Sequence, residues 1–348
     1  MTGRAEPLVA YLGWHRRGNL GDDAIYDAVR SQLSGASFVD LPLFLPEAVF
    51  AAARGLNRSL RRDKHVAQVV GGGTIVGRRV WRRWVNRGFT LANQGSYAIG
   101  VGVEEPVRTR FGGSGQDELK RWAPILSEFQ AVSVRGPRSA ELLSDIGLDV
   151  EVTGDPALLL PRPDQLPEDG LIGVNVGFGD GEIWGHDRAA VGEQLSIALK
   201  QLSSQGYRFV GILMNPKDRR WTETALRDVT ADIVLPDNAG AAAREFARCS
   251  VAVVSRLHAG ILAALSDTPV ISLEYQPKCR DFALSVANAQ YLIRTDELSA
   301  ADVVDRIESA LLEAANIRET TRAAVADLRQ RLQAEYASVQ RHLGLDVG

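Results

Sequence analysis

Short apolar runs alternate along this chain with longer stretches of helical period, and this alternation constrains the fold more than any other feature. Short apolar runs that end at glycine or at a polar residue are typical of buried parallel strands joined by crossover helices. The predicted strands are residues 8–12, 66–70, 97–101, 131–134 and 150–152 in the first half, and 171–176, 209–213, 232–235, 251–254 and 270–273 in the second. The sequence therefore predicts an α/β protein with parallel sheets.

The alternation is interrupted between residues 161 and 170, where prolines and charged side chains are typical of a linker. Because 348 residues exceed what one hydrophobic core usually supports, we expect two Rossmann-like domains, over residues 1–162 and 170–298. Residues 299–348 are predicted to close the fold as helices. Two such domains resemble the GT-B arrangement of glycosyltransferases, with an active site in the cleft between them.

Composition argues against several classes of protein. The net charge of -3 gives no global field for capturing nucleic acid, so no nucleic-acid partner is expected. Cys249 and Cys279 form neither a metal-ligand pair nor a disulfide framework. The N-terminal apolar run is too short for a signal peptide, and no segment approaches the roughly 18 apolar residues that span a bilayer. We therefore expect a cytoplasmic protein, and contact with the inner face of a membrane stays open.

Glycine-rich loops follow the first two predicted strands, at the edge where parallel sheets bind ligands. Glycine lets a ligand approach the backbone, and free amides at a helix start hold anions, but the spacing of the first loop favours a simple strand-to-helix turn in which Asp22 caps the helix. No Gly-Lys-Ser or Gly-Lys-Thr occurs in either loop, so a P-loop is not predicted. The candidates for binding a phosphate or an acceptor are Asn19, Gly21, Asp22, Gly72, Gly73 and Thr74.

Charged side chains follow the later strands. Arg135 comes directly after residues 131–134, where its planar guanidinium can hold a carboxylate or phosphate. Arg256 and His258 place a permanent cation and a titratable group next to the strand 251–254. Lys278 lies in a predicted loop and can neutralise a phosphate or be an exposed turn residue. Asp155 is a turn former or a carboxylate that binds the acceptor, and the turn is favoured.

The segment 78–87 contains five arginines and two tryptophans. This composition suits a diphosphate-linked acceptor or an anionic membrane surface. It suits equally well an amphipathic helix with a solvated basic face and buried tryptophans. The sequence leaves both interpretations open.

The order of these motifs resembles that of the polysaccharide pyruvyl transferase family over about residues 8–282. The motifs are Gly-Asn-Leu-Gly-Asp at 18–22, Gly-Gly-Gly at 71–73, Ser-Val-Arg at 133–135, Gly-Asp-Pro at 154–156, Arg-Leu-His at 256–258 and Tyr-Gln-Pro-Lys at 275–278. The resemblance implies that His258 is the general acid and that Arg135, Arg256 and the backbone of Leu257 bind phosphoenolpyruvate. It implies no cofactor or metal, with phosphoenolpyruvate as co-substrate.

The acceptor implied by the resemblance is a sugar, a nucleotide sugar or a lipid-linked saccharide. Residues 14–17 depart from the family pattern at a place where the acceptor is expected to bind, and His15 among them is a second acid–base candidate. One alternative function is that of a GT-B glycosyltransferase with a nucleotide-sugar donor. Another is a non-catalytic sugar-phosphate-binding or membrane-associated scaffold. Oligomeric state is not readable from the sequence.

Overall fold

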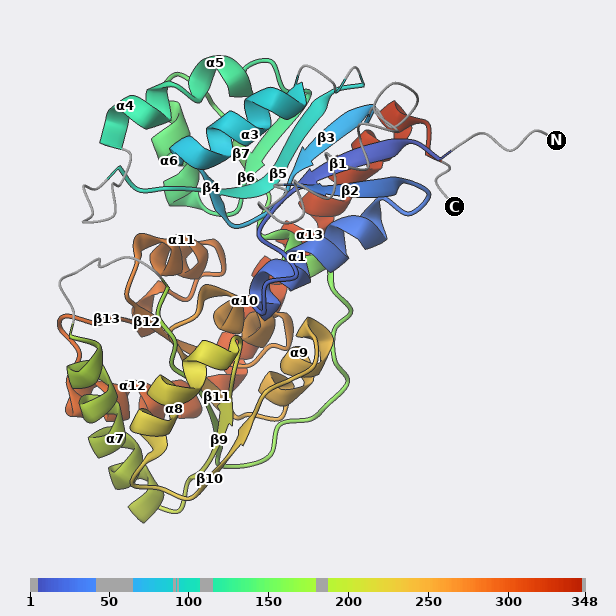
Figure 1. The fold of residues 1–348 in the computed structure, drawn as a ribbon. Helices are drawn as coiled ribbons and strands as arrows, with labels where there is room; N and C mark the ends of the chain where they lie inside the picture. Colours follow the sequence, from blue (N-terminus) through green and yellow to red (C-terminus); the bar gives the residue numbers. More distant parts are fainter. Residues whose placement is uncertain are drawn as a thin grey trace, which may run out of the picture.

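The computed structural model of the protein describes residues 6–41, 65–89, 92, 94–106, 115–179 and 187–345. The first half of the chain forms a seven-stranded parallel sheet in the order β2-β1-β3-β5-β6-β7, with β4 pairing to β5 (Figure 1). Its strands are β1 (Leu8–Leu12), β2 (Ser37–Leu41), β3 (Ala67–Val70), β4 (Thr74–Val76), β5 (Ser96–Val103), β6 (Ala131–Val134) and β7 (Glu151–Val152).

The second half forms a six-stranded parallel sheet in the order β10-β9-β8-β11-β12-β13. Its strands are β8 (Leu171–Asn175), β9 (Arg208–Ile212), β10 (Ala231–Val234), β11 (Val251–Val254), β12 (Val270–Glu274) and β13 (Leu292–Arg294). This is the doubly wound Rossmann order, which reverses between β8 and β11, while the first sheet reverses between β1 and β3. Parallel sheets bind ligands at such points of reversal, so the carboxyl ends of these four strands are the places to look for a site.

Helices cover both sheets (Figure 1). Those of the first half are α1 (Leu20–Gln32), α3 (Arg79–Phe89), α4 (Gly115–Lys120), α5 (Ala123–Leu126), α6 (Pro137–Ser144) and the 3₁₀ turn η1 (Pro156–Leu159). The second half has α7 (Arg188–Ser204), η2 (Pro216–Asp218), α8 (Arg219–Leu226), α9 (Ala239–Ala247), α10 (Leu257–Leu265), α11 (Pro277–Ser285), η3 (Ala289–Tyr291) and α12 (Ala300–Leu312). The last helix, α13 (Ala314–Leu343), has 30 residues and returns to the first sheet.

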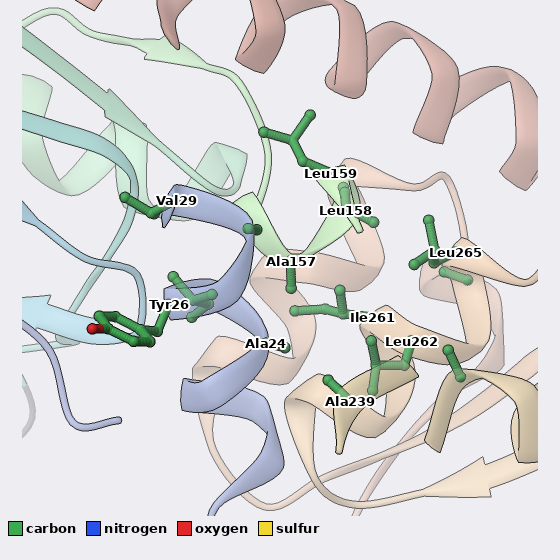
Figure 2. Packing of buried hydrophobic residues seen from close by; sticks show 14 of the residues in the cluster. Ala24, Tyr26, Val29, Ala157, Leu158, Leu159, Ala239, Ile261, Leu262 and Leu265 are labelled. Carbon is green, nitrogen blue, oxygen red and sulfur yellow. The ribbon is translucent and has the colours of Figure 1, made fainter. Parts of the chain in front are cut away.

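One hydrophobic core joins the two halves of the molecule. It packs α1 and η1 of the first half against α9 and α10 of the second, with Ala24, Ala157 and Ile261 fully buried among them (Figure 2). The backbone N–H of Leu20 also donates to the carbonyl of Met214 at 3.0 Å. This hydrogen bond is made by the first residue of α1. Together with the shared core it holds the N-terminus of α1 beside the second half.

The predicted strands are present, most of them within one or two residues of their predicted ends. Sequence patterns missed β2, β4 and β13, because β2 lies at a sheet edge and is only half-buried and the other two have three residues each. The prediction of a loop around Lys278 was wrong. Pro277 is the first residue of α11, where its fixed φ suits a helix start, and Lys278 lies in the first helical turn.

Candidate active site

Arg256 and His258 stand at the carboxyl end of β11, at the reversal point of the second sheet. Arg256 is the N-cap of α10, and the loop after β8 holds this turn in place. Ser255 donates its hydroxyl to the carbonyl of Gly177 at 2.7 Å, and the amide of Arg256 donates to Asn175 Oδ1 at 3.3 Å. The sheet topology therefore delivers the cation and the imidazole to the edge that faces the first half.

The guanidinium of Arg256 is held by Asp218, the last residue of η2. Nη2 and Nε lie 2.6 and 3.0 Å from Asp218 Oδ1. Gly177 makes this packing possible, because a Cβ atom there would lie 2.1 Å from the same oxygen. Burial disfavours the charge on Arg256, but Asp218 and Tyr275 outweigh it and raise the pKa. Arg256 is therefore a fixed cation, and 16% of its side chain is exposed.

His258 lies on the first turn of α10 and faces the first half of the molecule. Its Nε2 is 3.6 Å from Asp155 Oδ2, and a Cβ atom on Gly21 would lie 2.2 Å from its Nδ1. The imidazole is buried, with 8% of the residue exposed. The two nitrogens of this second-half residue are therefore both bordered by residues of the first half.

Arg135 directly follows β6 and belongs to the same cluster of side chains as His258, at a more deeply buried position. It is 1% exposed, and its Nη2 donates to Thr74 Oγ1 at 2.9 Å. Two carboxylates flank it at 4.0 Å, Asp155 beside Nη1 and Asp281 beside Nε. The structure thus brings Arg135 close to His258 through Asp155, but in a position that solvent scarcely reaches.

Asp155 is fully buried, and the sequence predicted it as a turn former. That prediction is confirmed, because Oδ1 accepts the amide of Ala157 at 3.0 Å and so caps η1. Burial alone would raise the pKa of Asp155, but His258 and Arg135 outweigh it and lower the pKa. Sequence reasoning missed this second set of contacts. Its position at a strand end, beside the predicted site, was the available signal.

The first glycine-rich loop shapes the start of α1. Asn19, and not Asp22, is the residue that caps the helix, with its Oδ1 accepting the amide of Gly21 at 3.3 Å. The side-chain amide of Asn19 also donates to Asp22. Asp22 is partly buried, and its carboxylate approaches Gly73, where a Cβ atom would lie 3.6 Å from Oδ1. Asp22 therefore lies between the two glycine-rich loops.

The second glycine-rich loop divides into packing and surface positions. Gly72 is buried against Ile25, where a Cβ atom would lie 2.6 Å from Cδ1, so the lack of a side chain makes this close packing possible. Gly73 has φ +100°, which favours glycine, and is partly exposed. Thr74 is also partly exposed and begins β4. Gly73 and Thr74 are thus the residues of this loop that border the candidate site.

Lys278 lies at the edge of the cluster on α11. Its Nζ is 5.1 Å from the ring centroid of Tyr275, a cation–π distance. Burial raises the pKa of Asp22, and His258, Asn19 and Lys278 oppose that rise without cancelling it. Lys278 therefore favours the ionised form of Asp22, although the two residues come from different halves of the molecule.

Substituting Asp22 by asparagine is expected to stabilise the protein at neutral pH. A raised pKa means that the folded state binds a proton more tightly than the unfolded chain, so ionisation of Asp22 costs stability as pH rises above about 4. Asparagine does not ionise and avoids this cost. Melting temperatures from pH 4 to 8 should show the variant gaining a few degrees at the alkaline end only. Asp305→Asn, at an exposed site on α12, is the matched control. A pH-independent difference would contradict the assignment.

His15, the second acid–base candidate, lies in a different cluster. Its Nε2 is 3.2 Å from Asp40 Oδ1, and its ring stacks on Tyr26 with centroids 3.9 Å apart. Tyr11 packs edge-on against the same ring at 4.9 Å. These contacts give His15 a packing role at the start of the loop after β1.

The segment 78–87 forms the greater part of α3. Trp81 is buried in the core of the first half, while Arg82 and Arg78 pair with Glu118 and Glu104 at 2.5 and 3.1 Å. These contacts favour the amphipathic-helix interpretation for this part of the segment. No helix among those described is long and apolar enough to cross a membrane.

Comparisons with known proteins agree with this architecture. S. aureus MnaA in complex with UDP superimposes with a TM-score of 0.63 at 11% identity, over 98% of each chain. UDP-GlcNAc 2-epimerase from Neisseria meningitidis, bound to UDP-GlcNAc, has a TM-score of 0.61 at 12% identity, over 96% of this chain and all of that chain (100%). Phytolacca americana UGT2 has a TM-score of 0.55 at 12% identity, over 96% of this chain and 100% of that one. These likenesses confirm the predicted GT-B fold.

Sequence comparison identifies the family. No curated protein matches the chain in sequence. The sequence model of the family described as polysaccharide pyruvyl transferase matches residues 19–277, which include Asp22, Asp155 and His258. Because that match covers most of the chain, the protein belongs to the polysaccharide pyruvyl transferase family.

Proposed function

We propose that the protein transfers the enolpyruvyl unit of phosphoenolpyruvate to a sugar-containing acceptor, as a pyruvate ketal, and releases phosphate. The observation that carries the proposal is the placement of His258. It lies at the N-terminus of α10, next to the fixed cation Arg256, and is bordered by both halves of the molecule. A titratable group beside cations at a sheet reversal point suits proton transfer to an anionic substrate.

Donor binding is assigned to the second half. Arg256 uses Nε and Nη2 for Asp218, so its Nη1 edge is left to face an anion. The N-terminus of α10 has no side-chain cap, and its positive dipole end favours negative charge near Leu257. Lys278 adds a further cation on α11. The phosphate and carboxylate of phosphoenolpyruvate are the kind of anionic groups that these residues recognise.

Arg135 is also proposed to help bind the donor, and because its guanidinium is buried, it acts through a neighbouring residue. The Nη2 of its buried guanidinium donates to the hydroxyl of Thr74, a residue that is partly exposed. In this arrangement Thr74 contacts the donor and Arg135 supplies positive charge behind it. Asn19, Gly21, Asp22 and Gly73 border the same space on the acceptor side.

The proposed reaction begins when His258 gives its proton to the methylene carbon of phosphoenolpyruvate. The central carbon becomes electrophilic and accepts one acceptor hydroxyl, after which its bond to the phosphate oxygen breaks. A second hydroxyl of the same acceptor then adds and closes the ketal. Of the two hydroxyl protons released, one restores His258 and the other leaves with phosphate. Arg256 and Lys278 stabilise the charge that collects on the departing phosphate.

The first test is calorimetric titration of phosphoenolpyruvate into the unmodified protein and into Arg256→Ala. Loss of a charge-assisted contact of about 1.5–3 kcal/mol predicts binding weaker by roughly 10- to 150-fold. Arg227→Ala is the matched control, because Arg227 is an exposed arginine that pairs with Glu193 at 2.6 Å. It should bind like the unmodified protein.

The same titration separates the alternative functions. Saturable binding of a nucleotide sugar without binding of phosphoenolpyruvate would favour a glycosyltransferase. Binding of phosphoenolpyruvate without turnover on a panel of free sugars, nucleotide sugars and lipid-linked saccharides would favour a non-catalytic binding protein. Turnover on one member of the panel identifies the class of acceptor.

A further inference from the structure

We propose that Asp155 of the first half positions the imidazole of His258 of the second half. The general acid of this site therefore depends on residues from both halves of the molecule. The inference rests on the proposed function, in which His258 donates a proton. It goes beyond that function because it names the residue that orients the imidazole and the nitrogen that delivers the proton. It also gives the buried Arg135 a role that needs no direct contact with substrate.

The carboxylate of Asp155 is fixed on two sides. Oδ1 accepts the amide of Ala157, and Arg135 Nη1 lies 4.0 Å from Oδ2. The remaining direction of Oδ2 is toward Nε2 of His258, 3.6 Å away. The turn capped by Asp155 thus holds one oxygen in line with the imidazole, so the carboxylate is oriented before any ligand binds.

The two facing atoms are both buried and lack hydrogen-bond partners in the part of the chain that the structure describes. A buried carboxylate oxygen and a buried imidazole nitrogen are costly when unsatisfied. A closing shift of roughly half an ångström would bring them within hydrogen-bond distance. Because Asp155 and His258 belong to different halves, a small approach of the halves completes the pair.

Pairing at Nε2 decides which nitrogen delivers the proton. Nδ1 is the nitrogen that faces Gly21, where the absence of a side chain lets α1 pack closely on the ring without a clash. With Nε2–H donated to Asp155, Nδ1 carries the proton that moves to the donor. Gly21 therefore borders Nδ1 of the imidazole, and Asp155 faces Nε2 of the same ring.

Other charges act on the same imidazole. Asp22 on α1 interacts with it electrostatically, Arg135 lies beside Asp155, Arg256 precedes it on its own turn, and Lys278 acts on Asp22. Burial raises the pKa of Asp22, whereas His258 and Arg135 lower that of Asp155 despite its burial. Asp155 is thus the carboxylate that stays ionised over the wider pH range.

Asp155→Asn is the decisive variant. Asparagine retains an oxygen to cap η1 and nearly the same volume, so it removes the charge with little change in shape. With the oxygen of the substituted side chain still on the amide of Ala157, its NH₂ group faces Nε2, so the neutral imidazole of His258 should lose its preference for the Nε2–H tautomer. The chain has five histidines, so the ¹⁵N chemical shifts of the rings are resolved by NMR, and the His258→Gln spectrum assigns those of His258. We expect kcat to fall about 10- to 100-fold with little change in phosphoenolpyruvate binding.

Asp281→Asn is the matched control. Asp281 is also buried, lies 4.0 Å from the other side of Arg135, and caps α6 by accepting the amide of Arg138 at 2.9 Å. It shares the burial, the arginine neighbour and the capping role of Asp155, but its carboxylate accepts hydrogen bonds from Arg138 and Ser139 of α6. The tautomer of His258 in Asp281→Asn should therefore match that of the unmodified protein, even if the melting temperature falls.

Each outcome bears on the proposal. An unchanged tautomer of His258 in Asp155→Asn overturns it and leaves Asp155 as a helix cap alone. If Asp155→Asn does not fold, Asp155→Glu keeps the charge at an altered distance, and is expected to preserve the Nε2–H tautomer while kcat falls. The NMR measurement needs no phosphoenolpyruvate. Failure of the unmodified protein to bind phosphoenolpyruvate therefore overturns the proposed function separately from the pairing.

Discussion

His258→Gln is expected to lower kcat for ketal formation by about 10²- to 10⁴-fold, the range typical for loss of a general acid. Glutamine has a similar size and stays neutral, so it cannot protonate the methylene carbon of phosphoenolpyruvate. Donor binding should change only a few-fold, because Arg256 and the N-terminus of α10 remain in place. The expected result is therefore a fall in kcat without a matching loss of affinity.

Turnover in D₂O provides the direct measurement. The proposed proton transfer adds one deuterium to the methyl group of each ketal, which mass spectrometry detects as a gain of about one mass unit. His15→Gln is the matched control, since His15 is packed against Tyr26 and Asp40 outside the cluster. It should lose stability but retain turnover. Normal turnover by His258→Gln would show that another group protonates the donor.

Gly21→Ala is expected to have the second large effect, a loss of turnover of at least about 100-fold, the scale seen when catalytic groups are misplaced by 1 Å. Real Cβ atoms do not approach other atoms to 2.2 Å, so the added methyl must displace the His258 ring or push α1 away from α10. Either response separates His258 from Asp155. The residue is not at positive φ, so the effect arises from contact and not from backbone strain.

Gly240→Ala is the control for this substitution. Gly240 lies in the first turn of α9, where an added Cβ would meet no atom closer than 3.4 Å. Alanine there should raise or preserve the melting temperature, because glycine is the poorer helix former. Initial rates, phosphoenolpyruvate titration and melting curves are compared for both variants. Full activity of Gly21→Ala would mean that the close packing of α1 on His258 is not required.

The sequence predicted the parallel strands well because their signal is local. β1, β6 and β11 match the predicted bounds, since largely buried parallel strands are short, mostly apolar runs. The elements that the sequence failed to predict also have a physical explanation. β2 at the sheet edge mixes polar and apolar residues, and the proline that begins α11 appeared to mark a loop.

The motifs also predicted which edge of each sheet carries the charged residues, because parallel strands place their carboxyl ends together. They predicted Arg135, Arg256 and His258 as candidates without indicating what each one touches. The structure shows that Asp218 pairs with Arg256 and that Asp155 faces His258, and it places Arg135 between two carboxylates. Roles in catalysis and donor binding stay predictions until the variants are measured.

The sequence by itself determined most of the buried strands, the family and the order of the motifs, because each of these is recorded in neighbouring residues. The tertiary structure alone decided that Gly21 and Asp155 of one half meet His258 of the other. That meeting depends on how α1, η1 and α10 pack around one hydrophobic core. Such packing is set by the shapes of side chains far apart in the chain, which no local pattern records.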